Sequence, residues 1–161
     1  MNRFRPLLLV AFLSSFLAAC LPDEVNPNIT PTVDLYVTVV DELGNTVSQA
    51  QVYLFSFEST YQNYLVENPE GDPNITPLVG ADDVGVTNST GQAIFFNRPL
   101  EGNSYASGDT WFHRPNPIYI RVQANLGGVY YTNDRTVNRI SFDEIESGER
   151  IVEYLEIEVN I

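Results

Sequence analysis

The sequence predicts an all-β protein, built as an antiparallel β-sandwich of about seven strands. Apolar and polar residues alternate along several short segments, which is the pattern of strands that bury one face. Turn-forming residues, glycine and asparagine above all, separate these segments. The chain has one cysteine, Cys20, so its core alone has to stabilise the domain without a disulfide framework.

The first two strands are expected within residues 33–57. Residues 33–40 alternate between an apolar and a more polar face, and Gly44 and Asn45, which tolerate positive φ, suit a tight reversal. Residues 51–57 are apolar on both faces, so we expect this arm inside a sheet and not at its edge. We interpret 33–57 as a hairpin. The apolar face of its first arm consists of Val33, Leu35, Val37 and Val39.

A long excursion follows at residues 58–86, rich in proline, glycine, asparagine and aspartate. A segment of this length is usually a functional loop or an insertion with some order of its own. Tyr61, Tyr64 and Leu65 either cover an edge of the core or serve in binding, and we favour the covering role.

The second half of the chain predicts the remaining strands. Residues 118–124 alternate, and the Gly127-Gly128 turn leads into 129–132 as a hairpin. Residues 141–144 have the spacing of a capping box, with Gly148 as a stop, which predicts one short helical turn. The closing strand places Leu155, Ile157, Val159 and Ile161 on one face.

Two half-motifs carry a family resemblance. The residues from Asp41 to Leu54 read D-x-x-G-x-x-V-x-x-A-x-V-x-L, and those from Thr87 to Phe95 read T-x-x-x-G-x-x-x-F, followed by a leucine and a glycine before Tyr105. This pattern resembles the transthyretin-like or carboxypeptidase-regulatory family and its relatives, the Cna-B-type surface modules. The resemblance covers about residues 33–161 and implies a Greek-key β-sandwich. Turn glycines and core positions make up the motif, so it says almost nothing about function.

The N-terminus predicts a targeting segment at residues 1–19. Arg3 and Arg5 form a short positive region, and the apolar run 7–16 is too short to span a bilayer. Residues 17–20, Leu-Ala-Ala-Cys, resemble the lipobox of bacterial lipoproteins, which implies lipidation of Cys20. We therefore expect residues 20–32 to be the lipidated cysteine and a proline-rich tether, and 33–161 to be the folded domain.

The tether also bears on location. Asp23 and Glu24 look like the acidic surface-export tags of lipoproteins in some outer-membrane bacteria. We expect the protein to be lipid-anchored in the outer membrane and exposed at the cell surface, and otherwise to face the periplasm. Several acyl chains on Cys20 would anchor it stably.

Composition excludes several functions. The formal net charge is −13 at pH 7, so a phosphate backbone would be repelled and nucleic-acid binding is not expected. All eight basic residues are arginines, which leaves no lysine for Schiff-base chemistry, for a P-loop or for a lysine-derived isopeptide crosslink.

The sequence also argues against an enzyme. Intradiol dioxygenases and hydroxyisourate hydrolases, which share the fold, need more histidines than the single His113. We expect no cofactor and no metal site, because neither Asp82-Asp83 nor the Glu70-Gly71-Asp72 turn has the alternate-residue acid spacing of an EF-hand calcium loop. His113 is interpreted as a surface or packing histidine.

The sharpest candidate site is the segment 108–117, GDTWFHRPNP, interpreted as an exposed loop bounded by glycine and proline. Its aromatic residues either stack on a ligand or close one end of the sandwich, and we favour the second role. The candidate ligand-binding residues are Asp109, Trp111, Phe112, His113 and Arg114.

The expected function is therefore a lipid-anchored, non-enzymatic binding or accessory module for another envelope protein. The alternative is a carbohydrate-binding or adhesion module that uses the aromatic segment 108–117.

Overall fold

The computed structural model describes residues 29–67, 80–133 and 139–161. These residues form eleven strands and one helix, more strands than the seven or so predicted, because four of the strands have only two to four residues. The elements are β1 (Thr32–Asp41), β2 (Gln51–Phe55), α2 (Glu58–Glu67), β3 (Asp83–Val86), β4 (Gln92–Pro99), β5 (Gly102–Ser107), β6 (Thr110–Pro115), β7 (Ile118–Leu126), β8 (Val129–Thr132), β9 (Arg139–Ile140), β10 (Ile145–Glu146) and β11 (Arg150–Val159).

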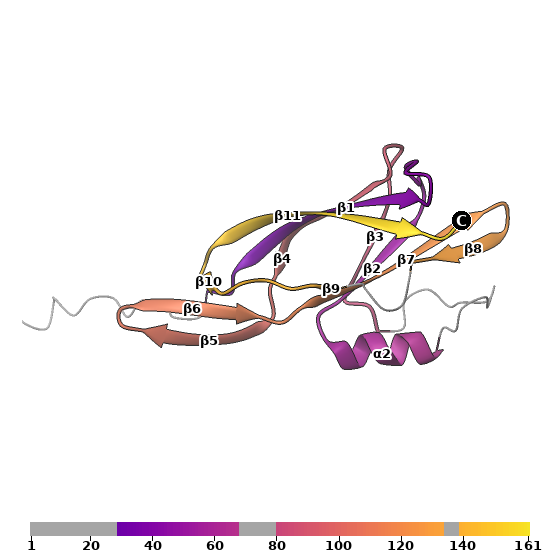
Figure 1. The fold of residues 1–161 in the computed structure, drawn as a ribbon. Helices are drawn as coiled ribbons and strands as arrows, with labels where there is room; N and C mark the ends of the chain where they lie inside the picture. Colours follow the sequence, from indigo (N-terminus) through magenta and orange to yellow (C-terminus); the bar gives the residue numbers. More distant parts are fainter. Residues whose placement is uncertain (1–28, 68–79, 134–138) are drawn as a thin grey trace, which may run out of the picture.

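Three sheets make up the fold, and they confirm the all-β sandwich (Figure 1). Sheet A has the order β11-β1-β4, and sheet B has the order β3-β2-β7-β8, with β9 also paired to β7. Sheet C has the order β10-β6-β5, and its β5–β6 hairpin projects from one end of the molecule. All strand pairs are antiparallel except β1 and β11, which run parallel over ten residues. Greek-key connectivity and the transthyretin-like family stay predictions.

The interpretation of residues 33–57 as a hairpin is wrong. β1 belongs to sheet A, whereas β2 belongs to sheet B and lies between β3 and β7. The reversal at Gly44, with a φ of 81°, therefore carries the chain from one sheet to the other. The prediction that β2 lies inside a sheet is confirmed. The alternation of apolar residues shows which face of a strand is buried, but not which strand pairs with it. Here the apolar faces of β1 and β2 pack against each other across the core, and the two strands are not neighbours in one sheet.

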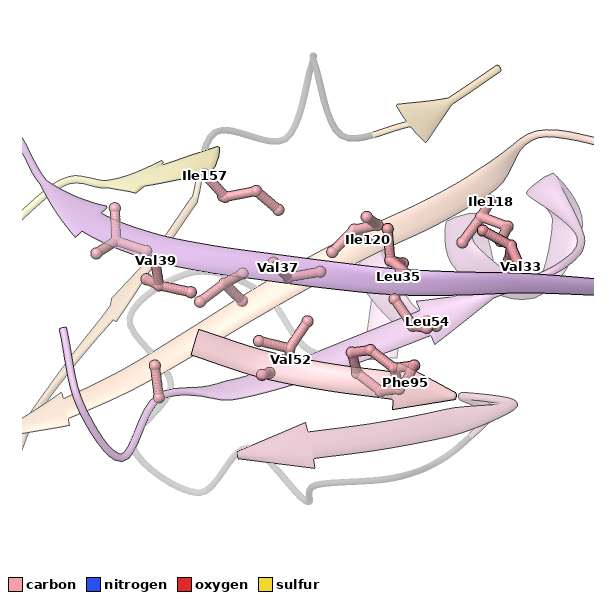
Figure 2. Packing of buried hydrophobic residues seen from close by; sticks show 14 of the residues in the cluster. Val33, Leu35, Val37, Val39, Val52, Leu54, Phe95, Ile118, Ile120 and Ile157 are labelled. Carbon is pink, nitrogen blue, oxygen red and sulfur yellow. The ribbon is translucent and has the colours of Figure 1, made fainter. Parts of the chain in front are cut away.

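The main core lies between sheets A and B (Figure 2). The predicted apolar face of β1 is fully buried, and it packs with the inward residues of β2, β4 and β7. The closing strand β11 contributes its predicted face, although Ile161 lies beyond the strand and is exposed. The labelled core residues in Figure 2 are Val33, Leu35, Val37, Val39, Val52, Leu54, Phe95, Ile118, Ile120 and Ile157.

The helix α2 covers the outer face of sheet B. Tyr61 and Tyr64 are buried there against Tyr53, Phe55 and Tyr119. This confirms that the aromatic residues of the 58–86 segment cover apolar surface. The prediction of some order in this segment holds for α2 and β3, and residues 68–79 lie outside the described part of the chain.

Two further turns were predicted with different outcomes. The β7–β8 hairpin is confirmed, with Gly127 and Gly128 at φ of 64° and 88°. The helical turn predicted at 141–144 is wrong, because these residues have no regular secondary structure and lead into β10, where Ile145 is buried and pairs with His113 of β6. Sheet pairing and burial of Ile145 thus override the local capping signal. No helix among the described residues is long and apolar enough to cross a bilayer.

Candidate binding face

The outer face of sheet A carries a row of three aromatic rings. Tyr36 of β1 lies between Tyr154 of β11 and Phe96 of β4. The Tyr36 and Tyr154 rings stack, with centroids 4.9 Å apart and planes 17° apart, and Phe96 meets Tyr36 edge-on at 6.1 Å. The row exists because Tyr36 pairs in register with Tyr154 on one side and with Ile94 on the other.

The two outer rings of this row are open to solvent, and Tyr36 between them is half-buried. Tyr154 is 73% exposed and Phe96 is 63% exposed, and Ile94 and Val152 beside them are exposed as well. We call Tyr36, Ile94, Phe96, Val152 and Tyr154 together the aromatic face. A contiguous exposed apolar patch of this kind marks an interaction site more often than a random surface does.

On the opposite side of the molecule, a similar aromatic surface is covered by a helix. The outer face of sheet B also carries aromatic residues, Tyr53, Phe55 and Tyr119, and there α2 buries them. Figure 1 shows α2 on the far side of the molecule from β1 and β11. Within the described residues, no element covers the aromatic face in the corresponding way.

Charged residues border the aromatic face at both ends. At one end, Arg150 of β11 pairs with the buried carboxylate of Asp34, which also accepts a hydrogen bond of 2.7 Å from the Asn97 amide. The hydrogen bond from Arg150 and the one from Asn97 lower the pKa of Asp34. At the other end, Glu156 and Glu158 extend from β11 into solvent. Arg150 and Asp34 neutralise each other, so the unpaired charge beside the aromatic face is the negative charge of Glu156 and Glu158.

The geometry of the rings limits what they can bind. A sugar ring stacks on an aromatic ring that offers its flat side to solvent. Tyr36 instead has Tyr154 against one flat side and the Phe96 edge nearby. The three rings pack on one another as a cluster, and clustered exposed aromatic side chains suit contact with an apolar groove of a protein.

The segment 108–117 is not an exposed loop. Residues 110–115 form β6, which pairs with β5 through the turn at Gly108 and Asp109. The five candidate residues of this segment therefore do not lie on one face of the hairpin. Trp111 and His113 project from one face of the hairpin, Phe112 and Arg114 project from the other, and Asp109 lies in the turn.

His113 is buried and both of its ring nitrogens are engaged. Nε2 lies 2.7 Å from the carbonyl oxygen of Leu100, and Nδ1 lies 2.9 Å from the Ser104 hydroxyl on the opposite strand. A carbonyl oxygen only accepts, so in the neutral ring Nε2–H donates to Leu100 and Nδ1 accepts from Ser104. This confirms a packing role for the histidine. One ring nitrogen thus bonds the Ser104 hydroxyl, but the other donates to a backbone carbonyl and not to a carboxylate, as it would in a catalytic triad.

The other face of the β5–β6 hairpin holds a small polar cluster. The Arg114 guanidinium lies 5.7 Å from the centre of the Tyr105 ring and 3.3 Å from the Glu144 carboxylate. A hydrogen bond to Glu144 raises the pKa of Tyr105. Phe112 packs beside Tyr105 with ring centroids 6.0 Å apart. These contacts tie the hairpin to the segment before β10.

The acidic pair Asp82-Asp83 is engaged with one arginine. Arg98, itself buried, lies 3.6 Å from Asp82 and 3.3 Å from Asp83. Within the described residues, no three histidine, cysteine or acidic side chains are grouped as a metal site. The acidic turn at Glu70–Asp72 and the predicted lipidation site Cys20 lie outside the described residues.

Comparison with models of protein families and with curated proteins finds no match to this chain. Sequence reasoning missed the aromatic face as a site because its residues come from three distant segments. A signal was nevertheless present. Tyr36, Phe96 and Tyr154 are aromatic residues at strand positions whose alternation points away from the core. Large apolar residues at several such positions indicate a covered or interacting outer face.

Proposed function

We propose that this protein is a lipid-anchored, non-enzymatic module of the cell envelope that binds another envelope protein through the aromatic face. The observation that supports this proposal is the contrast between the two outer faces. Aromatic residues on sheet B lie under α2, whereas Phe96 and Tyr154 on sheet A are exposed. A protein partner would bury the second set as α2 buries the first.

The shape of the aromatic face favours a protein partner over a glycan. Aromatic side chains that pack closely at the centre of a surface are typical hot spots of protein interfaces. The stacking of Tyr154 on Tyr36 covers one flat side of each ring, which leaves less flat ring surface for a sugar. The alternative carbohydrate function, based on residues 108–117, now has less support, because Trp111 and Phe112 project from opposite faces of a strand.

The charge at the border specifies the chemistry of the partner. Glu156 and Glu158 lie next to the aromatic face, and the whole chain has a net charge of −13. A second copy would bring like charges together, so self-association is disfavoured. The partner is instead a protein with an apolar groove and with arginine or lysine beside it.

Site-specific crosslinking on intact cells tests the proposal. A photoreactive phenylalanine analogue at Val152 should capture one abundant envelope protein, whereas the same analogue at Leu43, exposed at the turn after β1, should not. The double variant Phe96→Ala, Tyr154→Ala should reduce capture from Val152 at least tenfold, and added salt should weaken it further.

Two results would contradict this function. Equal capture from Val152 and Leu43 would remove the aromatic face as the contact. Glycan binding that disappears in the double variant, without any protein capture, would favour the carbohydrate function instead.

The membrane anchor has a separate test. Cys20→Ser should release the protein from membranes into the soluble fraction, because the proposed lipid chains are the anchor. Membrane retention of the Cys20→Ser variant would count against lipidation while leaving the protein-binding face untested by that result alone.

A further inference from the structure

The sheets differ in how their outermost strands are protected against pairing with another chain. Exposed strand edges present unpaired N–H and C=O groups, and proteins usually block them with charges, proline, bulges or short length. In sheet A, β11 carries four charged residues, and β4 ends in Arg98-Pro99 with a register shift at the positive-φ residue Asn97. In sheet B, the outer strands β3 and β8 have four residues each.

The strand β5 has none of these protections. It is six residues long, every one of them is exposed, and its sequence GNSYAS contains no charged residue and no proline. Its register with β6 is regular from Gly102 to Ser107. Among the described residues it pairs with β6 alone, so its second edge faces solvent.

The pairing with β6 shows which backbone groups point to that open edge. Asn116 N–H donates to the Glu101 carbonyl at 2.7 Å, which makes this pair a hydrogen-bonded one. Hydrogen-bonded and non-hydrogen-bonded pairs alternate in an antiparallel ladder. Gly102, Ser104 and Ala106 therefore direct their N–H and C=O groups outward. Gly102 lies opposite Pro115. Proline has no N–H to donate, which is consistent with a pair that exchanges no hydrogen bonds.

A pocket of about 290 Å³ lies along the start of the same strand. Its lining includes the five consecutive residues 100–104, together with Thr30 and His113. Because residues 100–104 line the pocket together with His113 of β6, it lies against the beginning of β5, next to the outward backbone groups of Gly102 and Ser104. Glu101 is the charged residue in this lining.

We propose that the open edge of β5 accepts an extended polypeptide segment as an added strand, with an arginine or lysine side chain of that segment in the pocket beside Glu101. Backbone pairing with Gly102, Ser104 and Ala106 supplies the sequence-independent part of the affinity, and the pocket supplies the preference for a basic side chain. This site is separate from the aromatic face and does not depend on it.

The partner strand comes from a different protein rather than from a second copy. Two copies of β5 could pair edge to edge, but the sequence GNSYAS brings no basic side chain to Glu101. The net charge of −13 on each copy also opposes that pairing.

Binding of designed peptides to the purified full-length chain tests the proposal. The probe is a synthetic peptide of alternating serine and threonine with one central arginine, and its matched control has glutamate in place of arginine. The arginine peptide should bind about tenfold more tightly. It should also slow hydrogen exchange at the amides of Gly102, Ser104 and Ala106, while the amides of Asn103 and Tyr105, already bonded to β6, change little.

Two changes should abolish binding for a backbone reason. Ala106→Pro removes an outward N–H without removing a bond to β6, and Ala106→Ser is its matched control, which should bind like the unmodified protein. The second change is made in the peptide, by N-methylation of alternate amides. It tests the same pairing even if Ala106→Pro fails to fold.

Glu101→Gln tests the pocket. In this variant the ratio of the affinities for the arginine and glutamate peptides should fall to near unity.

Three results would overturn the proposal. They are tight binding of the N-methylated peptide, absence of binding at millimolar peptide, and protection of amides away from β5. Sedimentation of the protein alone as a dimer with protected β5 amides would identify a second copy as the occupant and would equally refute a foreign strand.

Discussion

Tyr36 of β1 stacks on Tyr154 of β11, with ring centroids 4.9 Å apart, across the parallel pair formed by the first and last strands of the domain. The two residues are far apart in the chain and become neighbours only when β11 pairs with β1 in this register. The aromatic face is therefore a property of the completed fold. Because two of its rings are exposed, we expect the aromatic face to contribute less to the stability of the fold than the core residues on the other side of the same strands.

The first prediction concerns that division between the two sides of sheet A. Tyr154→Ala should lower the free energy of unfolding by about 1 kcal/mol or less, because the ring is exposed and loses mainly its stacking on Tyr36. Phe95→Ala, on the buried side of β4, should cost about 3–5 kcal/mol. Urea denaturation measures both. A cost for Tyr154→Ala close to that for Phe95→Ala would show that the face is structural rather than available for binding.

The sequence predicts burial well where a strand repeats its alternation over many residues. The face of β1 and the two-sided burial of β2 follow from the apolar pattern itself. The burial of Arg121 and Gln123 on the second face of β7 does not follow from it. The partner of each strand does not follow, because period-two alternation contains no information about which strand lies beside it. For that reason residues 33–57 suggested a hairpin, and the parallel pairing of β1 with β11 was not foreseen.

The interpretation of residues 108–117 as a loop failed for a local reason. Glycine and proline at its borders suggested a loop, yet residues 110–115 can also alternate as a strand. Pairing with β5 decides between the two, and it sends Trp111 and Phe112 to opposite faces. The covering role of the tyrosines in residues 58–86 was predicted correctly, because large aromatic side chains tend to be buried whether the backbone forms a loop or a helix.

The second prediction concerns pH. Hydrogen bonds from Arg150 and Asn97 hold the pKa of Asp34 below its ordinary value, so ionised Asp34 stabilises the folded state. This contribution is fully present above the unfolded pKa of about 4 and is lost as the pH falls through the lower folded pKa. Asp34→Asn should therefore lower the thermal midpoint at pH 7, and its difference from the unmodified protein should shrink below about pH 4.

A matched variant separates this effect from general loss of charge. Asp109→Asn, in the exposed turn of the β5–β6 hairpin, should leave the thermal midpoint at pH 7 nearly unchanged. If Asp34→Asn and Asp109→Asn behaved alike across the pH range, the contact between Asp34 and Arg150 would not be the cause.

The third prediction concerns the buried histidine. His113→Phe keeps an aromatic ring in the hairpin but removes the bonds to the Leu100 carbonyl and to Ser104, so it should cost about 1–3 kcal/mol of unfolding free energy. Ser104→Ala removes the more exposed of these bonds and should cost about 1 kcal/mol or less. Chemical denaturation of the two variants provides the comparison, and equal costs would argue against a buried bond to Leu100.

The last prediction gives a physical reason for the threonine in the second half-motif. Thr87 is fully buried, and its hydroxyl donates to the Val47 carbonyl at 2.7 Å and accepts from the Ala50 amide at 2.9 Å. These two hydrogen bonds therefore connect the turn before β2 to the segment between β3 and β4. Thr87→Val has nearly the same shape but leaves a buried amide and a buried carbonyl without this partner.

We expect Thr87→Val to cost about 2–4 kcal/mol, whereas Thr87→Ser, which keeps the hydroxyl, should cost about 1 kcal/mol or less. Hydrogen exchange provides a local readout, because the Ala50 amide should exchange faster in Thr87→Val and nearly normally in Thr87→Ser. If the two variants had the same stability and the same exchange at Ala50, the methyl packing of Thr87, and not its hydroxyl, would be what the fold requires at this position.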